Sequence, residues 1–376
     1  MHLYDHQNDN VFPLPFLPFE LIIEILLRLP ARSLLQLRRV CKLWKTLISD
    51  PILAKKHFLI STADPNMNHQ RLAFSNYKTC YSYPLKSLFE HPSSRVISDS
   101  FSDLKGDYYM LGSCNGLLCL FDEDQWSVIM YNPASIGLKS KCSPKFNPLP
   151  DWVILYYGFG YDYVNNKYKL LAVVENYDSS DDDEDFGESL TKIYTFGENS
   201  WRTIQDLPYT PLTQYLGKYV SGTLNWIGRK LKRCMIISFD LDKETYRDVL
   251  LPQNVPDCDF MCRPSLCVLN DSLCLCYVNK THLVAWLMKE YGVVDSWTKL
   301  LNIPREKLSF LNSIKQYSII DLLFISENGI VLLMVSSQFF LYNLNSGVLD
   351  HPLITINIVF DPRLYPQIYC ENLISP

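Results

Sequence analysis

In residues 17–58 the apolar positions recur at intervals of three and four, which is the spacing of one face of a helix. Pro18 is suited to the first position of a helix, and Pro30 stops the pattern after about three turns. Ser33 is placed to cap a second helix, which Pro51 ends. The pattern therefore predicts two short helices.

These predicted helices carry more apolar surface than they can bury by themselves. A segment of roughly forty residues is too small for a stable core of its own. The rest of the chain or a partner must therefore cover part of the apolar stripe.

After Phe58 the pattern changes to short alternating runs rich in aromatic and β-branched residues, separated by Gly, Asn, Asp and Pro. This pattern predicts an all-β domain. Trp201, Tyr246 and Trp297 lie 45 and 51 residues apart, and repeats of about 40–50 residues are typical of β-propeller blades. We expect a β-propeller, with a β-sandwich as the alternative. The repeating unit covers residues 219–252, 266–304 and 322–343.

The length of 376 residues allows one small module and one large domain. We divide the chain into a flexible tail at 1–12, a helical module at 13–57 and a β domain at 58–376. The N-terminus lacks the pattern of a signal peptide, and no apolar run approaches the roughly 20 residues that cross a bilayer. We expect a soluble protein of the cytoplasm, the nucleus or both, with no membrane partner.

Charge divides the chain unevenly. Residues 28–56 contain eight Lys or Arg and one acid, a net charge of +7, while the whole chain carries −5 and the remainder −12. A basic, partly apolar helical surface attracts an acidic protein or phosphate groups. Nucleic acid is the less favoured partner, because the segment has no interleaved exposed aromatics and the rest of the chain is acidic.

Candidate chemistry is sparse. The twelve cysteines form no Cys-x-x-Cys pair and the seven histidines are scattered, so we assign no catalytic, cofactor-binding or metal-binding residues. Cys274 and Cys276 alternate with leucines in a strand-like run, which predicts small buried residues on one face.

The segment 178–188 has seven acids in eleven residues. We expect an extended, solvated loop between strands. The alternative is a surface regulated by phosphorylation, because Ser179 and Ser180 precede acidic residues.

The helical segment resembles an F-box, the motif that joins substrate receptors to cullin-type ubiquitin ligases through a Skp adaptor. Its Leu-Pro pairs, Val-Cys-Lys run, tryptophan and Ser-Asp-Pro run occur where the plant version of the motif has them. The resemblance implies adaptor contacts by Leu17, Pro18, Ile22, Ile25, Leu29, Pro30, Leu34, Val40, Cys41 and Trp44.

The β region resembles the plant F-box-associated domain, which is related to kelch-like receptors. The residues that carry the resemblance lie in segments 112–120, 131–133, 158–170 and 201–240. No Gly-Gly doublet occurs, so the number of blades stays open. We assign Asn115 and Asn132 only to turns, because Asn-Gly and Asn-Pro are common turn sequences.

The resemblance implies a non-catalytic substrate-recognition subunit of a Skp-cullin-F-box ubiquitin ligase, in which the helices hold the adaptor and the β domain binds a protein target. The target and the residues that bind it are not readable from the sequence. Two alternatives remain at this point: a Skp-binding scaffold that does not degrade its partner, and an enzyme with a site in the propeller channel.

Overall fold

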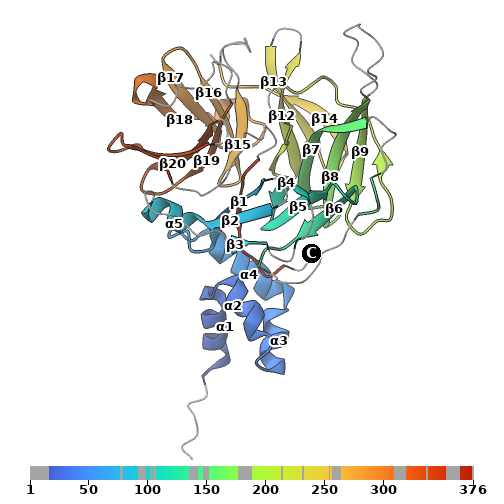
Figure 1. Ribbon diagram of the computed structural model, residues 1–376, viewed down its shortest axis with the longest axis vertical. Helices are drawn as coiled ribbons and strands as arrows, with labels where there is room; N and C mark the ends of the chain where they lie inside the picture. The colour runs from blue at the N-terminus through green and yellow to red at the C-terminus, as the bar shows by residue number, and fades with distance from the viewer. Residues whose placement is uncertain are drawn as a thin grey trace, which may run out of the picture.

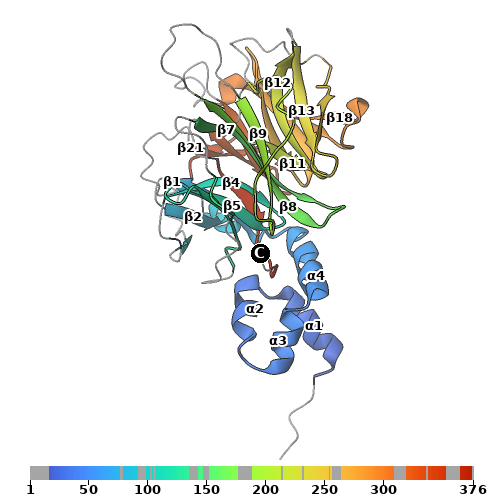
Figure 2. The same ribbon diagram turned by 90° about the vertical axis from the view of Figure 1, so that its right-hand side faces the viewer.

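Four helices precede a ring of six antiparallel sheets in the computed structural model, and the helices project from one side of the ring (Figure 1). The same arrangement is visible after a quarter turn, with α4 as the helix next to the sheets (Figure 2). The structure describes residues 17–76, 79–91, 99–101, 104, 107–134, 143–146, 152–176, 189–212, 215–230, 233–253, 255, 264–308, 319–335, 338–352 and 365–374.

The helical part contains four helices where the sequence predicted two, so that prediction was wrong. They are α1 (Phe19–Arg28), α2 (Ala31–Leu37), α3 (Lys42–Ile48) and α4 (Pro51–Thr62). The N-cap of α2 is Pro30, not Ser33. The expected second helix is interrupted because Cys41 is extended, with φ −155° and ψ 167°, and its sulfur caps α3 by accepting from the backbone N–H of Trp44 at 3.5 Å.

Asp50 and Pro51 end one helix, as predicted, but they also begin the next. The carboxylate of Asp50 accepts the backbone N–H of Ile52 at 2.9 Å, and Pro51 occupies the first turn of α4. As a result, the helical region continues to Thr62.

The first three sheets, blades 1 to 3, follow the helices along the chain. Blade 1 also receives the last strand of the chain, and α5 (Leu85–Glu90) follows its strand β2. Among the described residues, blade 2 has three strands and each of the other blades has four. The strands are β23 (Gln367–Cys370), β1 (Gln70–Asn76), β2 (Thr79–Pro84) and β3 (Asp99–Ser100) in blade 1; β4 (Tyr108–Cys114), β5 (Leu117–Asp122) and β6 (Ser127–Tyr131) in blade 2; β7 (Trp152–Asp162), β8 (Lys167–Asn176), β9 (Ser189–Thr195) and β10 (Arg202–Thr203) in blade 3.

Blades 4 to 6 coincide with the three repeating units read from the sequence, which confirms the propeller and excludes the sandwich. Two short 3₁₀ turns, η1 (Val294–Ser296) and η2 (Arg305–Lys307), flank β18. The strands are β11 (Lys218–Val220), β12 (Thr223–Lys230), β13 (Arg233–Asp240) and β14 (Thr245–Val249) in blade 4; β15 (Ser265–Leu269), β16 (Ser272–Val278), β17 (His282–Met288) and β18 (Trp297–Pro304) in blade 5; β19 (Ile320–Ile325), β20 (Ile330–Val335), β21 (Gln338–Asn343) and β22 (Leu349–Asp350) in blade 6.

The ring is closed by pairing the two ends of the β domain. β23 pairs with β1 in antiparallel register from Gln70 opposite Cys370 to Ala73 opposite Gln367. Each innermost strand contacts the innermost strand of the next blade, in the order β23, β4, β7, β11, β15, β19 and back to β23. The propeller therefore has six blades, and its C-terminal strand belongs to blade 1.

Apolar side chains from adjacent blades fill the spaces between the sheets. Cys274 and Cys276 are buried against blade 6, while the alternating Leu273 and Leu275 are buried on the blade 4 side, which confirms the predicted alternation. None of the described helices is long and apolar enough to cross a membrane.

Candidate functional site: the N-terminal helices and their junction with the propeller

The four N-terminal helices form one small core that includes two residues of the propeller. Leu26 and Leu34 are fully buried there with Ile48. Ala134, which follows β6, and Leu373, near the end of the chain, pack into the same cluster. The propeller thus covers part of the apolar stripe that the helices cannot bury alone.

His57 ties α4 to the end of α1. Its Nε2–H donates to the backbone carbonyl oxygen of Leu29 at 2.8 Å, and the hydroxyl of Ser61 lies 3.5 Å from Nδ1. The ring is fully buried and meets the ring of His69 edge-on, with 5.8 Å between centroids. Burial lowers the pKa of both histidines, because a charged imidazole loses its hydration there.

The predicted adaptor-binding residues fall into three groups. Ile25 is 50% exposed, Val40 is 65% exposed, and Leu34 is completely buried. Leu34 therefore holds the helices together from inside and offers no surface to a partner. The exposed members are Leu17, Pro18, Ile25, Pro30, Val40 and Cys41, and the half-buried members are Ile22, Leu29 and Trp44.

Several other apolar residues of the helices are also exposed but are not among the predicted adaptor-binding residues. Leu17, just before α1, and Leu21 and Ile25 on α1 are spaced four residues apart and form one exposed stripe. Leu26 and Leu27 face the core instead. In the sequence, the exposed apolar positions and the core-facing apolar positions of α1 overlap in one helical pattern. The tertiary contacts are needed to tell which of them face the core. The additional exposed residues are Phe19, Leu21, Leu43, Ile52, Leu59 and Ile60.

One of the basic residues of the helices faces the propeller instead of solvent. The Nε of Arg32 lies 3.2 Å from Oε1 of Glu371, and Nη1 of Arg71 lies 3.6 Å from the same oxygen. Glu371 is buried and directly follows β23. This carboxylate therefore joins α2, blade 1 and the end of the chain.

Asn132 links the connection after β6 to the segment after β23, and each of these two parts of the propeller contributes a residue to the helical core. Its side-chain amide donates to Oδ1 of Asn372 at 2.8 Å and to the carbonyl oxygen of Ile374 at 2.7 Å, and both asparagines are buried. Its own Oδ1 accepts the backbone N–H of Ala134 at 2.9 Å, which is the expected turn chemistry. The prediction that Asn132 serves only a turn was therefore incomplete, since the partner residues lie 240 positions away.

Other candidate chemistry is absent or lies outside the described residues. Within the part of the chain that the structure describes, no group of three or more His, Cys, Asp or Glu side chains could hold a metal ion. The predicted acidic loop at 178–188 and the predicted tail at 1–12 lie outside the described residues.

Two family models match the two parts of the chain. One, described as F-box-like, matches residues 14–60, and one described as an F-box associated beta propeller domain matches residues 70–369. The chain belongs to the F-box proteins with an F-box associated β-propeller.

Relatives from Arabidopsis thaliana place this F-box protein among plant F-box proteins. An F-box/kelch-repeat protein is 30% identical over 385 residues, 99% of each chain. The F-box protein CPR1 is 27% identical over 332 residues, 80% of this chain and 75% of that one. Among solved structures, a chain of a nidogen/laminin complex aligns with a TM-score of 0.43 and 11% identity over 80% of this chain and 99% of that chain.

Proposed function

We propose that this F-box protein is the substrate-recognition subunit of a Skp-cullin-F-box ubiquitin ligase. The observation that carries the proposal is the exposed apolar surface of α1, α3 and the connection from α2 to α3, with Leu21, Ile25, Val40 and Leu43 open to solvent. Exposed apolar residues gathered on one small module mark a surface for a protein partner. In this assignment the partner is a Skp-type adaptor, and cullin joins through the adaptor.

The protein acts by positioning and supplies no catalytic group. Binding a target on the propeller raises the effective concentration of its lysines near the ubiquitin thioester held by another subunit. The contacts between the helices and the propeller support this role, because Arg32 pairs with the buried Glu371 and because Ala134 and Leu373 pack into the helical core. A rigid junction keeps a bound target at one distance from the adaptor.

The experiment uses full-length protein and a variant with an altered helix surface. Leu21→Asp with Ile25→Asp places two charges at exposed positions of α1, and Val164→Asp in the β7–β8 turn is the matched control because it is also an exposed apolar position. The control should capture a Skp-type adaptor together with cullin, and the α1 variant should capture neither. Adaptor capture by the α1 variant at the level of the control would contradict the proposal.

The same variant separates a ubiquitin ligase receptor from a non-degradative scaffold. Deleting the helices outright would expose Ala134 and Leu373, which pack into the helical core, so the point variant is the better trap for targets. A target captured by the α1 variant should have a longer half-life in cells that carry this variant, and proteasome inhibition should remove the difference. An unchanged half-life would favour the scaffold.

The proposed assembly works in the cytoplasm, the nucleus or both. Imaging of a fluorescent fusion tests this, and accumulation in a secretory compartment would contradict it.

A further inference from the structure

Within the part of the chain that the structure describes, blade 2 has three strands, whereas each of the other blades has four. In blade 2 the segment 143–146 runs beside β6. The backbone N–H of Ser143 donates to the carbonyl oxygen of Val128 at 2.8 Å, and the backbone N–H of Phe146 donates to the carbonyl oxygen of Trp126 at 2.6 Å. These bonds hold the segment against the sheet without forming a regular strand.

Trp201 and Trp297 occupy similar positions beside the fourth strands of blades 3 and 5, but they differ in how far the neighbouring blade covers them. Trp201 precedes the fourth strand of blade 3, and its Nε1–H donates to the carbonyl oxygen of Pro144 at 3.3 Å. Trp297 begins the fourth strand of blade 5, and its Nε1–H donates to the carbonyl oxygen of Leu250 at 3.2 Å. Trp297 is buried, whereas Trp201 is half-buried, so the surface is open only at the first of these two sites.

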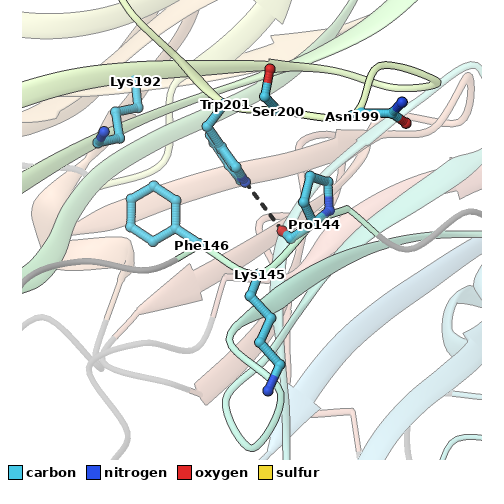
Figure 3. A pocket seen from close by; sticks show the side chains of 7 residues that line it. All are labelled: Pro144, Lys145, Phe146, Lys192, Asn199, Ser200 and Trp201. Atoms are coloured by element: carbon cyan, nitrogen blue, oxygen red, sulfur yellow. Dashed lines mark hydrogen bonds between the residues drawn. The ribbon is translucent and has the colours of Figure 1, made fainter.

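A pocket of about 280 Å³ lies at this opening. Its apolar wall consists of Phe146 and Trp201, whose rings meet edge-on with 4.7 Å between centroids. Figure 3 shows these rings between the side chains of Lys145 and Lys192. Asn199 and Ser200 add polar groups at the rim.

The charges of the pocket have one sign. Both lysines line it, and among the described residues no Asp or Glu lines it and neither lysine makes an ion pair. The whole chain carries −5, so an acidic ligand is attracted here by local charge and not by the protein as a whole.

We propose that this pocket binds an acidic segment of a protein target, with Asp or Glu carboxylates beside Lys145 and Lys192 and a neighbouring apolar side chain against Phe146 and Trp201. Its volume is just below the range of about 300–1,000 Å³ that is usual for small-molecule sites, which favours one or two side chains of a peptide over a larger ligand. An aromatic wall beside fixed positive charge suits a segment that alternates acidic and apolar residues. The proposal rests on the proposed function, because it names the class of target that the propeller binds.

The probe is a short fluorescein-labelled peptide of alternating Glu and Leu, and its control is the same peptide with Gln in place of Glu. Binding to the full-length protein is followed by fluorescence anisotropy at two salt concentrations. The acidic peptide should bind more tightly than the Gln peptide and lose affinity as salt rises.

The decisive variant is Lys145→Glu with Lys192→Glu, and the matched control is Lys280→Glu with Lys289→Glu, which makes the same charge change at exposed positions of blade 5. The pocket variant should weaken binding by roughly tenfold or more, and the control by less than about twofold, because only the first pair lies beside the bound carboxylates. Thermal unfolding of both variants should match the original protein. Equal losses in the two variants, no loss in the pocket variant, or equal binding of the Gln peptide would overturn the proposal.

Adaptor binding is measured on the same samples. The pocket variant should keep it, because the pocket lies on the propeller and the helix surface is unchanged. Failure of the peptide experiment with intact adaptor binding would reject the pocket alone, whereas loss of adaptor binding by the original protein would reject the proposed function.

Discussion

The imidazole of His57 donates a hydrogen bond to the backbone carbonyl oxygen of Leu29 at 2.8 Å, across 28 positions of the chain. This bond satisfies a carbonyl just beyond the end of α1 and fixes α4 beside it. The relationship explains why a histidine is fully buried beside a core cluster whose buried members are Leu, Ile and Ala.

Replacing His57 with Ala should therefore destabilise the helices. A buried carbonyl that loses its donor costs about 1–3 kcal/mol. Urea unfolding followed by circular dichroism measures the effect, and Lys56→Ala serves as the control because Lys56 is an exposed neighbour on the same helix. Equal stability of the two variants would show that the hydrogen bond contributes nothing.

Stability should fall in mild acid. Burial lowers the pKa of His57 and of His69, so below the ordinary histidine value of about 6.5 the unfolded chain binds protons that the folded chain does not. Stability is thus complete above this value and decreases as the pH falls from there toward the lowered folded-state pKa. Thermal unfolding between about pH 7.5 and pH 5.5 tests this, and His57→Gln with His69→Gln should flatten the dependence.

Substitutions at Ile25 and Leu34 should separate docking from folding. Ile25 is half exposed, so Ile25→Ala should weaken adaptor binding by about 2 kcal/mol if it is a central contact, with little change in stability. Leu34 is completely buried, so Leu34→Ala should cost about 2–5 kcal/mol of stability. Binding by surface plasmon resonance and unfolding by calorimetry provide the two readouts. A large loss of stability in Ile25→Ala would contradict the assignment of that side chain to the surface.

Ring closure should depend on Gly116 and on β23. Gly116 has a φ of +73°, and a Cβ there would lie 2.2 Å from the carbonyl oxygen of Cys370, a backbone atom that has little room to move. Gly116→Ala should therefore lower the unfolding temperature. A chain that ends at residue 364 should lose cooperative unfolding, because blade 1 would then lack its inner strand β23. The matched control is Gly197→Ala, since Gly197 also has a positive φ but its added Cβ meets only the end of a lysine side chain at 3.8 Å. Similar effects of the two glycine substitutions would argue against a special role of the contact with β23.

The basic surface of the helices should govern how fast the adaptor binds. Arg38, Arg39 and Lys42 make no ion pair among the described residues, whereas Arg32 is paired with Glu371 and is left out of this test. Reversing these three residues to Glu should slow association more than it speeds dissociation. For the original protein, association should slow as salt rises from about 0.1 M to about 1 M, because the Debye length shrinks from about 10 Å to about 3 Å. An association rate that does not respond to salt would assign docking to the apolar residues alone.

Local patterns of apolar and breaking residues were enough to predict where the helices and the propeller blades lie. The three-and-four spacing around Leu26, the stop at Pro30 and the break at Pro51 predicted helices in the right region, and the spacing of Trp201 and Trp297 predicted propeller blades. These features are local because a period of 3.6 or 2 residues describes which side of one element is apolar.

Which apolar side chains remain exposed, and how the ring closes, depends on contacts between elements that are distant in the sequence. Ile25 and Leu34 look alike in the pattern, yet one is exposed and the other is buried, because Ala134 and Leu373 pack into the same core as Leu34. The pairing of β23 with β1, like the pocket beside blade 2, joins segments that are distant in the sequence. Contacts of this kind depend on how whole elements pack, and a periodic pattern along one element carries no record of its distant neighbours.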